Sequence, residues 1–300
     1  MAHRVLSVQS SVVHGVVGNK AATFPLMIRG VEVDPLNTVQ FSNHTGYKVF
    51  KGDRLQAAQF SDLIDGLRAN RLLGSYSALL SGYVGNADIL AELARVVEEV
   101  KAANPSTVFL CDPVCGDNGA LYVKAEIPGV YRDALLSLAD IVTPNGFEAS
   151  HISGINVSSL ATAAAAAQWF HDKGVGVVVI TSFNDPALGD GIVVFASRKK
   201  SGDERPTCVW TLVPIIEGKF SGTGDLFSAA FLAEWLLQGP EKDLKKLVGR
   251  TVAVVQAVLR QTASVATGST DGAFTELQLV AGRHFLVDPP PGPPCHEFIE

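Results

Sequence analysis

The stretch Ser158–Thr181, SSLATAAAAAQWFHDKGVGVVVIT, decides the fold of this 300-residue chain. Its first part, Ser158–Lys173, is rich in alanine and predicts a helix. Its second part, Val175–Thr181, is a nearly continuous apolar run, which is typical of a strand buried on both faces of a parallel sheet. A helix followed closely by such a strand predicts an α/β protein whose central sheet is covered by helices.

The same alternation of strand and helix runs through most of the chain. The other strands predicted up to this point are Val5–Ser10, Val31–Phe41, Ala78–Val84, Val108–Cys111 and Ala139–Thr143. The predicted helices are Asn19–Arg29, a segment in which Phe60, Leu63, Ile64 and Leu67 recur at helical spacing, and Ala87–Ala103. We therefore expect a three-layer α/β/α fold with a mostly parallel central sheet and helices on both faces.

After Thr181 the pattern changes to a hairpin and two long helices. Gly191–Ala196 and Cys208–Val213 flank a polar turn and predict an antiparallel hairpin that extends the sheet. The helices Asp225–Leu237 and Asp243–Val265 follow. We expect residues 1–287 to form a single domain and the proline-rich residues 288–300 to form a C-terminal tail, on the surface or loose.

Composition and charge exclude several classes of protein. Hydrophobic residues make up 47% of the chain and charged residues 18%, which excludes intrinsic disorder. With 24 Lys and Arg against 30 Asp and Glu, the net charge of −6 argues against a nucleic-acid partner and a polybasic membrane attachment. The N-terminus lacks the apolar run of a signal peptide, and four cysteines are too few for a disulfide scaffold. We expect a soluble protein of the reducing cytoplasm.

The motif Gly222-Thr223-Gly224-Asp225 stands where the first of the two long helices begins. Glycines before a helix leave its first N–H groups bare, so that a phosphate or a developing oxyanion can bind there. Asp225 can face that ligand, or it can act only as an N-terminal cap. The motif is neither a Walker A loop, since no lysine follows, nor a Rossmann fingerprint, since it lies late in the chain.

Two further polar clusters follow predicted strands. Asp112–Asp117 comes after Val108–Cys111, and Thr143–Glu148 comes at the end of the next strand. Ligands of parallel sheets bind beyond the carboxyl ends of the strands, so we expect these groups to lie together. Three carboxylates, an amide and a hydroxyl suit Mg²⁺ that is shared with phosphate groups. Turns beside proline and a solvated helix start would explain each cluster alone, but two clusters together with the glycine motif favour a site.

Weaker signals lie elsewhere in the chain. The hydroxyls of Thr181 and Ser182 end a strand, where they can bond phosphate oxygens or serve only a turn. Ser10 and the segment Phe41–Tyr47 offer aromatic, imidazole and hydroxyl groups that can hold a flat, polar heteroaromatic ring. His44 alone is more often a hydrogen-bonded loop histidine than a catalytic group.

Taken together, these segments resemble the pyridoxal kinase family of the ribokinase-like superfamily, from Val5 to about Val265. The resemblance is carried by Arg4–Ser10, Gly18–Leu26 and Val39–Tyr47. Asn145-x-x-Glu148 and the glycine motif point to the wider superfamily. The resemblance implies a ribokinase-like kinase domain that phosphorylates the 5′-hydroxyl of pyridoxal, pyridoxine and pyridoxamine with ATP, in vitamin B6 salvage.

The resemblance also implies roles for individual residues. Asp225 would be the catalytic base, with Gly222, Thr223 and Gly224 forming the anion hole. The substrate site would consist of Ser10, Val17, Phe41, His44, Thr45, Tyr83 and Asp225. The ATP site would consist of Asp112, Tyr122, Asn145, Glu148, Thr181, Ser182, Gly222, Thr223 and Gly224. Metal ions would lie near Asp112, Asp117, Thr143, Glu148 and Thr181.

The implied cofactors are Mg²⁺ and a monovalent cation, K⁺ or Na⁺, with ATP as co-substrate. The implied partners are ATP, the B6 vitamers and a second copy of the chain in a homodimer. The sequence departs from the animal members in the loop Asp117–Tyr122, which is shorter here. In the family this loop belongs to a flap over the phosphates.

Two alternatives fit parts of the same sequence. A hydroxymethylpyrimidine kinase or a sugar kinase of the ribokinase type would share the phosphate-side motifs, although the segment Phe24–Phe60 is too short for the β-lid of sugar kinases. A catalytically silent nucleotide- or vitamin-binding protein would share the fold, although every residue required for chemistry is present. An ATP-consumption assay with B6 vitamers, pyrimidines and sugars distinguishes these readings.

Overall fold

A computed structural model describes residues 3–200, 202–238, 242–265 and 275–299. Within these ranges the main sheet has ten strands, in the order β14-β11-β10-β9-β8-β5-β4-β1-β2-β3. They are β1 (Arg4–Val12), β2 (Glu32–Phe41), β3 (Gly52–Arg54), β4 (Ala78–Ser81), β5 (Val108–Cys111), β8 (Ile141–Val142), β9 (Val177–Phe183), β10 (Ile192–Arg198), β11 (Thr207–Val213) and β14 (His296–Phe298). The strands from β2 across to β9 pair in parallel, and β3, β10, β11 and β14 are antiparallel additions at the two edges. The predicted mostly parallel sheet is confirmed.

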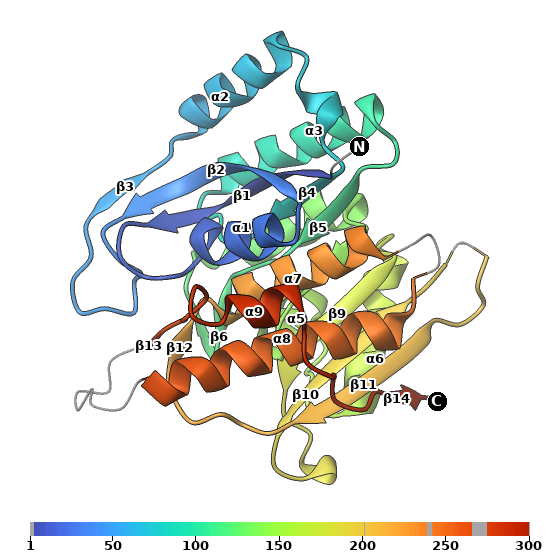
Figure 1. The fold of residues 1–300 in the computed structure, drawn as a ribbon. Coiled ribbons are helices and arrows are strands. Elements are labelled where there is room, and N and C mark those ends of the chain that lie inside the picture. Colours follow the sequence, from blue (N-terminus) through green and yellow to red (C-terminus); the bar gives the residue numbers. More distant parts are fainter. Residues whose placement is uncertain (1–2, 201, 239–241, 266–274, 300) are drawn as a thin grey trace.

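Helices cover both faces of this sheet (Figure 1), which confirms the predicted three layers. On one face lie α1 (Asn19–Ile28), α7 (Thr223–Leu237), α8 (Leu244–Val265) and α9 (Arg283–Val287). On the other lie α2 (Ala57–Ala69), α3 (Ala87–Ala103), α4 (Ile127–Val130), α5 (Gly146–Ser153) and α6 (Leu160–Asp172). No helix within the described ranges is long and apolar enough to cross a membrane.

Strand β9 shows why the apolar run of the sequence folds in this way. Successive side chains of a strand point to opposite faces of the sheet. Val178 and Ile180 accordingly belong to the core under α6, whereas Val177 and Val179 belong to the core under α7 and α8. All four side chains are buried, so the strand predicted to be covered on both faces is confirmed.

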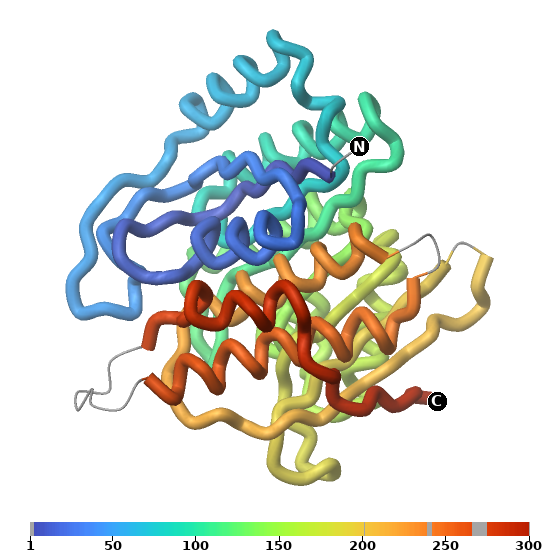
Figure 2. The backbone as a smooth tube through the Cα atoms, viewed as in Figure 1, coloured from blue at the N-terminus to red at the C-terminus, as the bar shows by residue number. Residues whose placement is uncertain are grey.

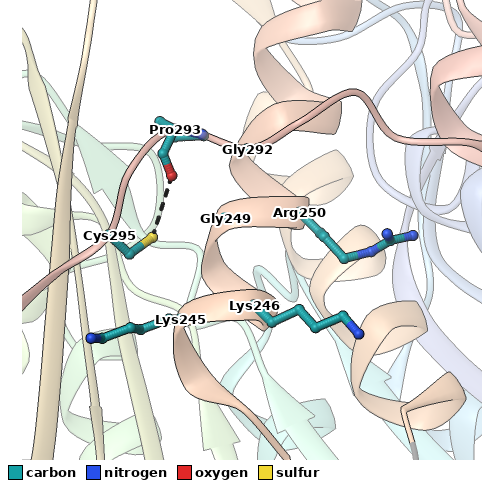
Figure 3. A pocket seen from close by; sticks show the side chains of 7 residues that line it. All are labelled: Lys245, Lys246, Gly249, Arg250, Gly292, Pro293 and Cys295. Carbon is teal, nitrogen blue, oxygen red and sulfur yellow. Dashed lines mark hydrogen bonds between the residues drawn. The ribbon is translucent and has the colours of Figure 1, made fainter.

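The C-terminal tail takes part in the main sheet. Figure 2 shows it passing along α8 before it reaches the edge of the sheet, where β14 pairs with β11. A Cβ atom on Gly292 would lie 2.4 Å from the carbonyl oxygen of Gly249, so only glycine allows the tail to cross α8 this closely (Figure 3). The sequence did not predict this strand, because three residues after a run of prolines carry no strand pattern of their own. The domain boundary at residue 287 stays a prediction.

The parallel topology places the functional segments at one edge of the sheet. Strands β1, β4, β5, β8 and β9 all run in the same direction, so the segments that follow them begin on the same side. Two short pairs stand apart from the main sheet: β6 (Gly116–Asp117) with β7 (Ala120–Leu121), and β12 (Phe220–Ser221) with β13 (Thr275–Glu276). The second pair joins the start of α7 to the C-terminal part of the chain.

His171 connects α6 to the sheet through a buried imidazole. Its Nδ1 lies 2.7 Å from the carbonyl oxygen of Val175, and its Nε2 lies 2.7 Å from Oγ of Ser197. Burial lowers the pKa of His171. The folded chain therefore keeps this ring neutral at a pH where the unfolded chain protonates it.

We expect the stability that His171 contributes to fall as the pH falls below about 6.5, the ordinary pKa of the unfolded residue. As the pH falls from about 7.5 to about 5.5, the difference in unfolding free energy between the wild type and His171→Gln should shrink, by at most about 1.4 kcal/mol per pH unit. Urea titrations at each pH measure the gap. A gap that stays constant over this interval would contradict a buried neutral histidine.

Candidate active site

Three polar side chains meet beyond the ends of β5 and β8. Oδ2 of Asp112 accepts a hydrogen bond from Oγ of Ser228 over 2.8 Å. The same Ser228 oxygen lies 2.9 Å from Oγ1 of Thr143. Ser228 lies three residues after Asp225 in α7, so the two share a helix face. Sequence reasoning missed Ser228, although this spacing could have found it.

Glu148 ties the segment after β5 to the start of α5. It forms a capping box with Asn145: Oε2 of Glu148 accepts from the backbone N–H of Asn145, and Oδ1 of Asn145 accepts from the backbone N–H of Glu148, each over 2.9 Å. Oε1 of Glu148 accepts from the N–H groups of Cys115 and Gly116, over 3.0 and 3.4 Å. Glu148 is only 4% exposed, so the alternative of a solvated helix start is wrong.

Among the described residues, no cationic side chain serves as a counterion for the carboxylates of this cluster. Burial, together with the charges of Glu148 and Asp225, raises the pKa of Asp112 well above its ordinary value. Burial raises the pKa of Glu148 to about 7, although three backbone N–H groups oppose the rise. In the described ranges no Lys or Arg forms an ion pair with these residues. The two buried carboxyl groups therefore favour a proton or a bound cation.

Asp225 stands at the start of α7, where the chain passes close to the first loop of the protein. The helix begins at Thr223 with Gly222 as its N-cap, two residues before the predicted start at Asp225. Gly222 has φ 83°, and a Cβ there would lie 2.2 Å from the carbonyl oxygen of Val16. This position therefore requires glycine.

The carboxylate of Asp225 reaches across to that first loop. Its Oδ2 accepts a hydrogen bond of 2.6 Å from the backbone N–H of Gly18, the residue that caps α1. Burial raises the pKa of Asp225, and the N–H of Gly18 offsets part of the rise. The position favours an aspartate that faces the site over one that only caps its own helix.

The residues predicted to hold the substrate ring form a second group. Val17 and Tyr83 pack against a small apolar cluster that contains Phe41. Ser10 lies directly beside Gly18, because a Cβ on Gly18 would come within 2.4 Å of the Ser10 Oγ. The hydrogen bond from Gly18 to Asp225 thus joins this group to the start of α7.

His44 and Thr45 lie in the loop that follows β2. Thr45 is exposed, and His44 is buried with its Nε2 3.2 Å from Oε1 of Glu276. The rings of His44 and Tyr47 lie 4.7 Å apart. Sequence reasoning did not assign Glu276, and no motif around it signals this contact.

The shortened loop Asp117–Tyr122 is a tight hairpin made by β6 and β7. Its turn residues Asn118 and Gly119 have φ 45° and 81°, as the common two-residue hairpin turn requires. Tyr122 is 52% exposed. Partial burial and a hydrogen bond to Asp117 nevertheless raise its pKa. The amide of Asn145 donates to the carbonyl oxygen of Gly116 over 2.8 Å, which fastens the hairpin to α5.

Thr181 and Ser182 lie in β9, beside the start of α5. Oγ1 of Thr181 donates weakly to the carbonyl oxygen of Pro144 over 3.4 Å. A Cβ on Gly146 would lie 3.0 Å from the carbonyl oxygen of Ser182. The structure thus brings these two residues beside Pro144 and Gly146, which flank Asn145; that they line an ATP site stays a prediction.

A separate pocket lies between α8 and the tail (Figure 3). It is lined by Lys245, Lys246, Gly249, Arg250, Gly292, Pro293 and Cys295. Lys245 and Arg250 form ion pairs with Glu297 and Glu234, so their charges already have partners. None of the predicted site residues lines this pocket.

Comparison with known proteins identifies relatives over nearly the whole chain. A family model described as phosphomethylpyrimidine kinase matches residues 75–273. Pyridoxal kinase of Arabidopsis thaliana is 42% identical over 86% of this chain and 82% of its own length. Human pyridoxal kinase is 36% identical over 95% and 96%. The structure of pyridoxal kinase from Leishmania donovani with ADP and pyridoxine superposes with a TM-score of 0.91, at 38% identity and 99% coverage of both chains.

The extent of each match separates these two descriptions. The family model begins at residue 75, so it leaves out Ser10 and the loop after β2. The pyridoxal kinases match over almost the full length, including this N-terminal part. A kinase of B6 vitamers therefore accounts for more of the chain than a kinase of pyrimidines.

The buried carboxylates should make the ligand-free protein less stable as the pH rises. Because the folded chain holds a proton on Asp112 that the unfolded chain has lost, the wild type loses stability as the pH rises above about 3.8 toward the raised pKa. Asp112→Asn keeps the size and removes one of two like charges.

In a chelating buffer we expect Asp112→Asn to be at least about 1 kcal/mol more stable than the wild type at pH 8, with a smaller difference at pH 5. Phosphoryl transfer should nevertheless fall. Denaturant unfolding at both pH values measures the difference. A variant that is destabilised equally at both would show that the Asp112 charge is already compensated in the folded chain.

Proposed function

This chain belongs to the pyridoxal kinase family of the ribokinase-like superfamily and phosphorylates B6 vitamers with ATP, and we propose that Asp225 is the catalytic base of the reaction. The hydrogen bond between Asp225 and Gly18 supports this proposal, because Gly18 lies beside Ser10 and Asp225 stands in the first turn of α7. The hydroxyl that is phosphorylated would be the 5′-hydroxyl of pyridoxal, pyridoxine or pyridoxamine. Proton transfer to Asp225 would proceed as that oxygen attacks the γ-phosphorus.

The vitamer would lie on the apolar side of the site. Val17, Phe41 and Tyr83 would pack against its ring, and Ser10 and Thr45 would bond its polar atoms. His44 would support this side of the pocket. The related Leishmania donovani protein binds pyridoxine in one structure and pyridoxamine in another, each with ADP.

ATP would bind on the opposite side of Asp225. Gly222, Thr223 and Gly224 would offer backbone N–H groups at the start of α7 to the transferred phosphoryl group. Asn145, Thr181 and Ser182 would line the remainder of the nucleotide site, with Glu148 below them. Tyr122 would reach over the phosphates from the β6–β7 hairpin.

The donor set fits metal ions. Asp112 and Glu148 are buried carboxyl groups with raised pKa values, and a cation is the natural partner for such a pair when both are ionised. Asp112, Asp117, Thr143, Glu148 and Thr181 would hold Mg²⁺ and a monovalent cation, K⁺ or Na⁺, together with the phosphates. When bound, these ions supply positive charge that offsets the charge of the transferred phosphoryl group. No group of three His, Cys, Asp or Glu in the described ranges could hold a metal alone, which favours an ion shared with ATP.

Two further properties of the family are part of the proposal. The chain would form a homodimer and would act in the cytoplasm. Sedimentation equilibrium of the full chain tests the first, with a mass of about 63 kDa expected, twice that of the 31.7 kDa chain.

A pyrimidine kinase is the second candidate, because the matching family model carries that description. Initial rates with pyridoxal and with hydroxymethylpyrimidine, at equal concentrations and saturating MgATP, separate the two. We propose that pyridoxal is the better substrate. A higher kcat/KM for the pyrimidine would reverse the assignment.

Asp225→Asn tests the base directly. Asparagine keeps the size and can still accept the hydrogen bond from Gly18, so the fold and the binding of both substrates should persist. It cannot take the substrate proton, so kcat should fall by roughly 10²–10⁴-fold. Steady-state kinetics and thermal melting of this one variant decide the matter. A cap role predicts instead near-normal turnover with a stability loss of about 0.5–2 kcal/mol.

Monovalent cations should support catalysis at fixed Mg²⁺. Replacing K⁺ by tetramethylammonium at constant ionic strength should lower the rate, because the bulky ion cannot enter between the Asp112 and Glu148 carboxylates and the phosphates. Rates with K⁺, Na⁺ and tetramethylammonium provide the measurement. Equal rates in all three salts would exclude a monovalent site.

A further inference from the structure

Glu276 connects three segments that lie far apart in the sequence. It ends β13, which pairs in parallel with β12 so that Glu276 lies opposite Ser221, the residue before Gly222. The backbone of Glu276 therefore lies beside the residue that precedes the glycine motif.

Both oxygens of the Glu276 carboxylate accept hydrogen bonds from the first two loops of the chain. Oε2 accepts a hydrogen bond of 2.7 Å from the backbone N–H of Val16. Oε1 accepts one of 3.0 Å from the hydroxyl of Tyr47, and it lies 3.2 Å from Nε2 of His44. The Glu276 side chain is 16% exposed, so these contacts form largely away from water. Charged acceptors in such surroundings make stronger hydrogen bonds than neutral ones.

The carboxylate also packs directly on the backbone of the first loop. A Cβ on Gly15 would lie 2.7 Å from both oxygens of Glu276, and Gly15 has φ 104°. Only glycine leaves room for this contact. Three residues later, the N–H of Gly18 donates to Asp225. The loop Gly15–Gly18 is thus held at one end by Glu276 and at the other by Asp225.

Hydrogen bonding keeps the Glu276 carboxylate charged. Burial alone would raise its pKa, but the donors from His44, Val16 and Tyr47 hold the pKa below its ordinary value. The contacts to His44 and Tyr47 lie on either side of Thr45, which is exposed between them. Because His44 and Tyr47 are both held, the short segment between them, including Thr45, has less freedom to move.

We propose that Glu276 is a positioning residue for the phosphorylation reaction: its carboxylate fixes the loop His44–Tyr47 against the loop Gly15–Gly18, so that the vitamer-binding hydroxyls and Asp225 keep one geometry. Glu276 does not touch the reacting atoms in this account. It acts through Tyr47, His44 and Val16. The proposal rests on the assignment of this side of the site to the vitamer.

Steady-state kinetics of Glu276→Ala tests the proposal. We expect the KM for pyridoxal to rise about tenfold or more, since several hydrogen bonds to one carboxylate are lost, and the KM for ATP to change less than about twofold. Glu276→Gln keeps an acceptor for Val16 and should recover part of the loss. Glu297→Ala is the matched control, because Glu297 is a carboxylate that pairs with Lys245 in the tail, away from both loops, and the kinetics of this variant should equal those of the wild type.

A double-mutant cycle with Tyr47→Phe makes the test independent of any effect on folding. Tyr47→Phe alone should raise the pyridoxal KM a few-fold. It should have no added effect when Glu276 is alanine, and a smaller effect than in the wild type when Glu276 is glutamine, whose amide can still bond the Tyr47 hydroxyl. Additive effects would overturn the proposal, as would an unchanged pyridoxal KM in Glu276→Ala. If Glu276→Ala does not fold, the cycle with Glu276→Gln decides.

Thr45→Ala separates this proposal from the functional assignment on which it rests. A raised pyridoxal KM in Thr45→Ala with no effect of Glu276 would overturn only the positioning role. An unchanged pyridoxal KM in Thr45→Ala would instead place the vitamer elsewhere.

Discussion

Two carboxyl groups, Asp112 and Glu148, are buried near one another, so that burial raises both pKa values and the charge of Glu148 raises the pKa of Asp112 further, and no Lys or Arg in the described part of the chain pairs with them. Such an arrangement costs folding free energy, because each ionised group is desolvated without a counterion. Asp225 adds a third negative group nearby. Bound cations and phosphate groups would offset this cost by bringing the missing charge and hydrogen-bond partners. This is the physical basis of the proposal that metal ions bind here together with ATP.

The fold supports this arrangement in a simple way. Parallel strands deliver Asp112 and Thr143 from adjacent ends of the sheet, and α7 brings Ser228 against both. The Glu148 carboxylate accepts hydrogen bonds from backbone N–H groups, including that of Cys115. Its position therefore depends on the path of the backbone and not on a flexible side chain. These contacts keep the carboxylates together despite their mutual repulsion. A cation entering the cluster would meet donors that are already in position.

Much of the architecture could be predicted from the sequence. The apolar run before Thr181 identified a strand covered on both faces, because its side chains fill two cores. Leu63 shares the helical spacing of Phe60 and Ile64, yet it is 52% exposed whereas they are buried. The apolar face of α2 is narrower than the spacing suggested. Strand β14 was missed because it depends on the free edge of β11 and not on its own residues.

In the candidate site, too, local sequence patterns identify some residues, whereas others are placed only by contacts between distant parts of the chain. The glycine motif before a helix was enough to place Asp225 near the start of α7, and helical spacing from Asp225 would have revealed Ser228. Glu276 could not be found in this way. Its partners Val16 and Tyr47 precede it by more than 200 residues, and its position depends on the pairing of β13 with β12. Contacts of this kind follow from the path of the whole chain.

Anomalous diffraction from a ternary complex tests the central claim most directly. Crystals would contain pyridoxal, a non-hydrolysable ATP analogue, Mn²⁺ in place of Mg²⁺ and Rb⁺ in place of K⁺. The account predicts anomalous peaks beside Asp112 and Glu148, bridging to phosphate oxygens, with the vitamer hydroxyl about 2.6–3.2 Å from the Asp225 carboxylate. A site in which Lys or Arg side chains neutralise these carboxylates without bound cations would contradict it, as would a vitamer hydroxyl that points away from Asp225.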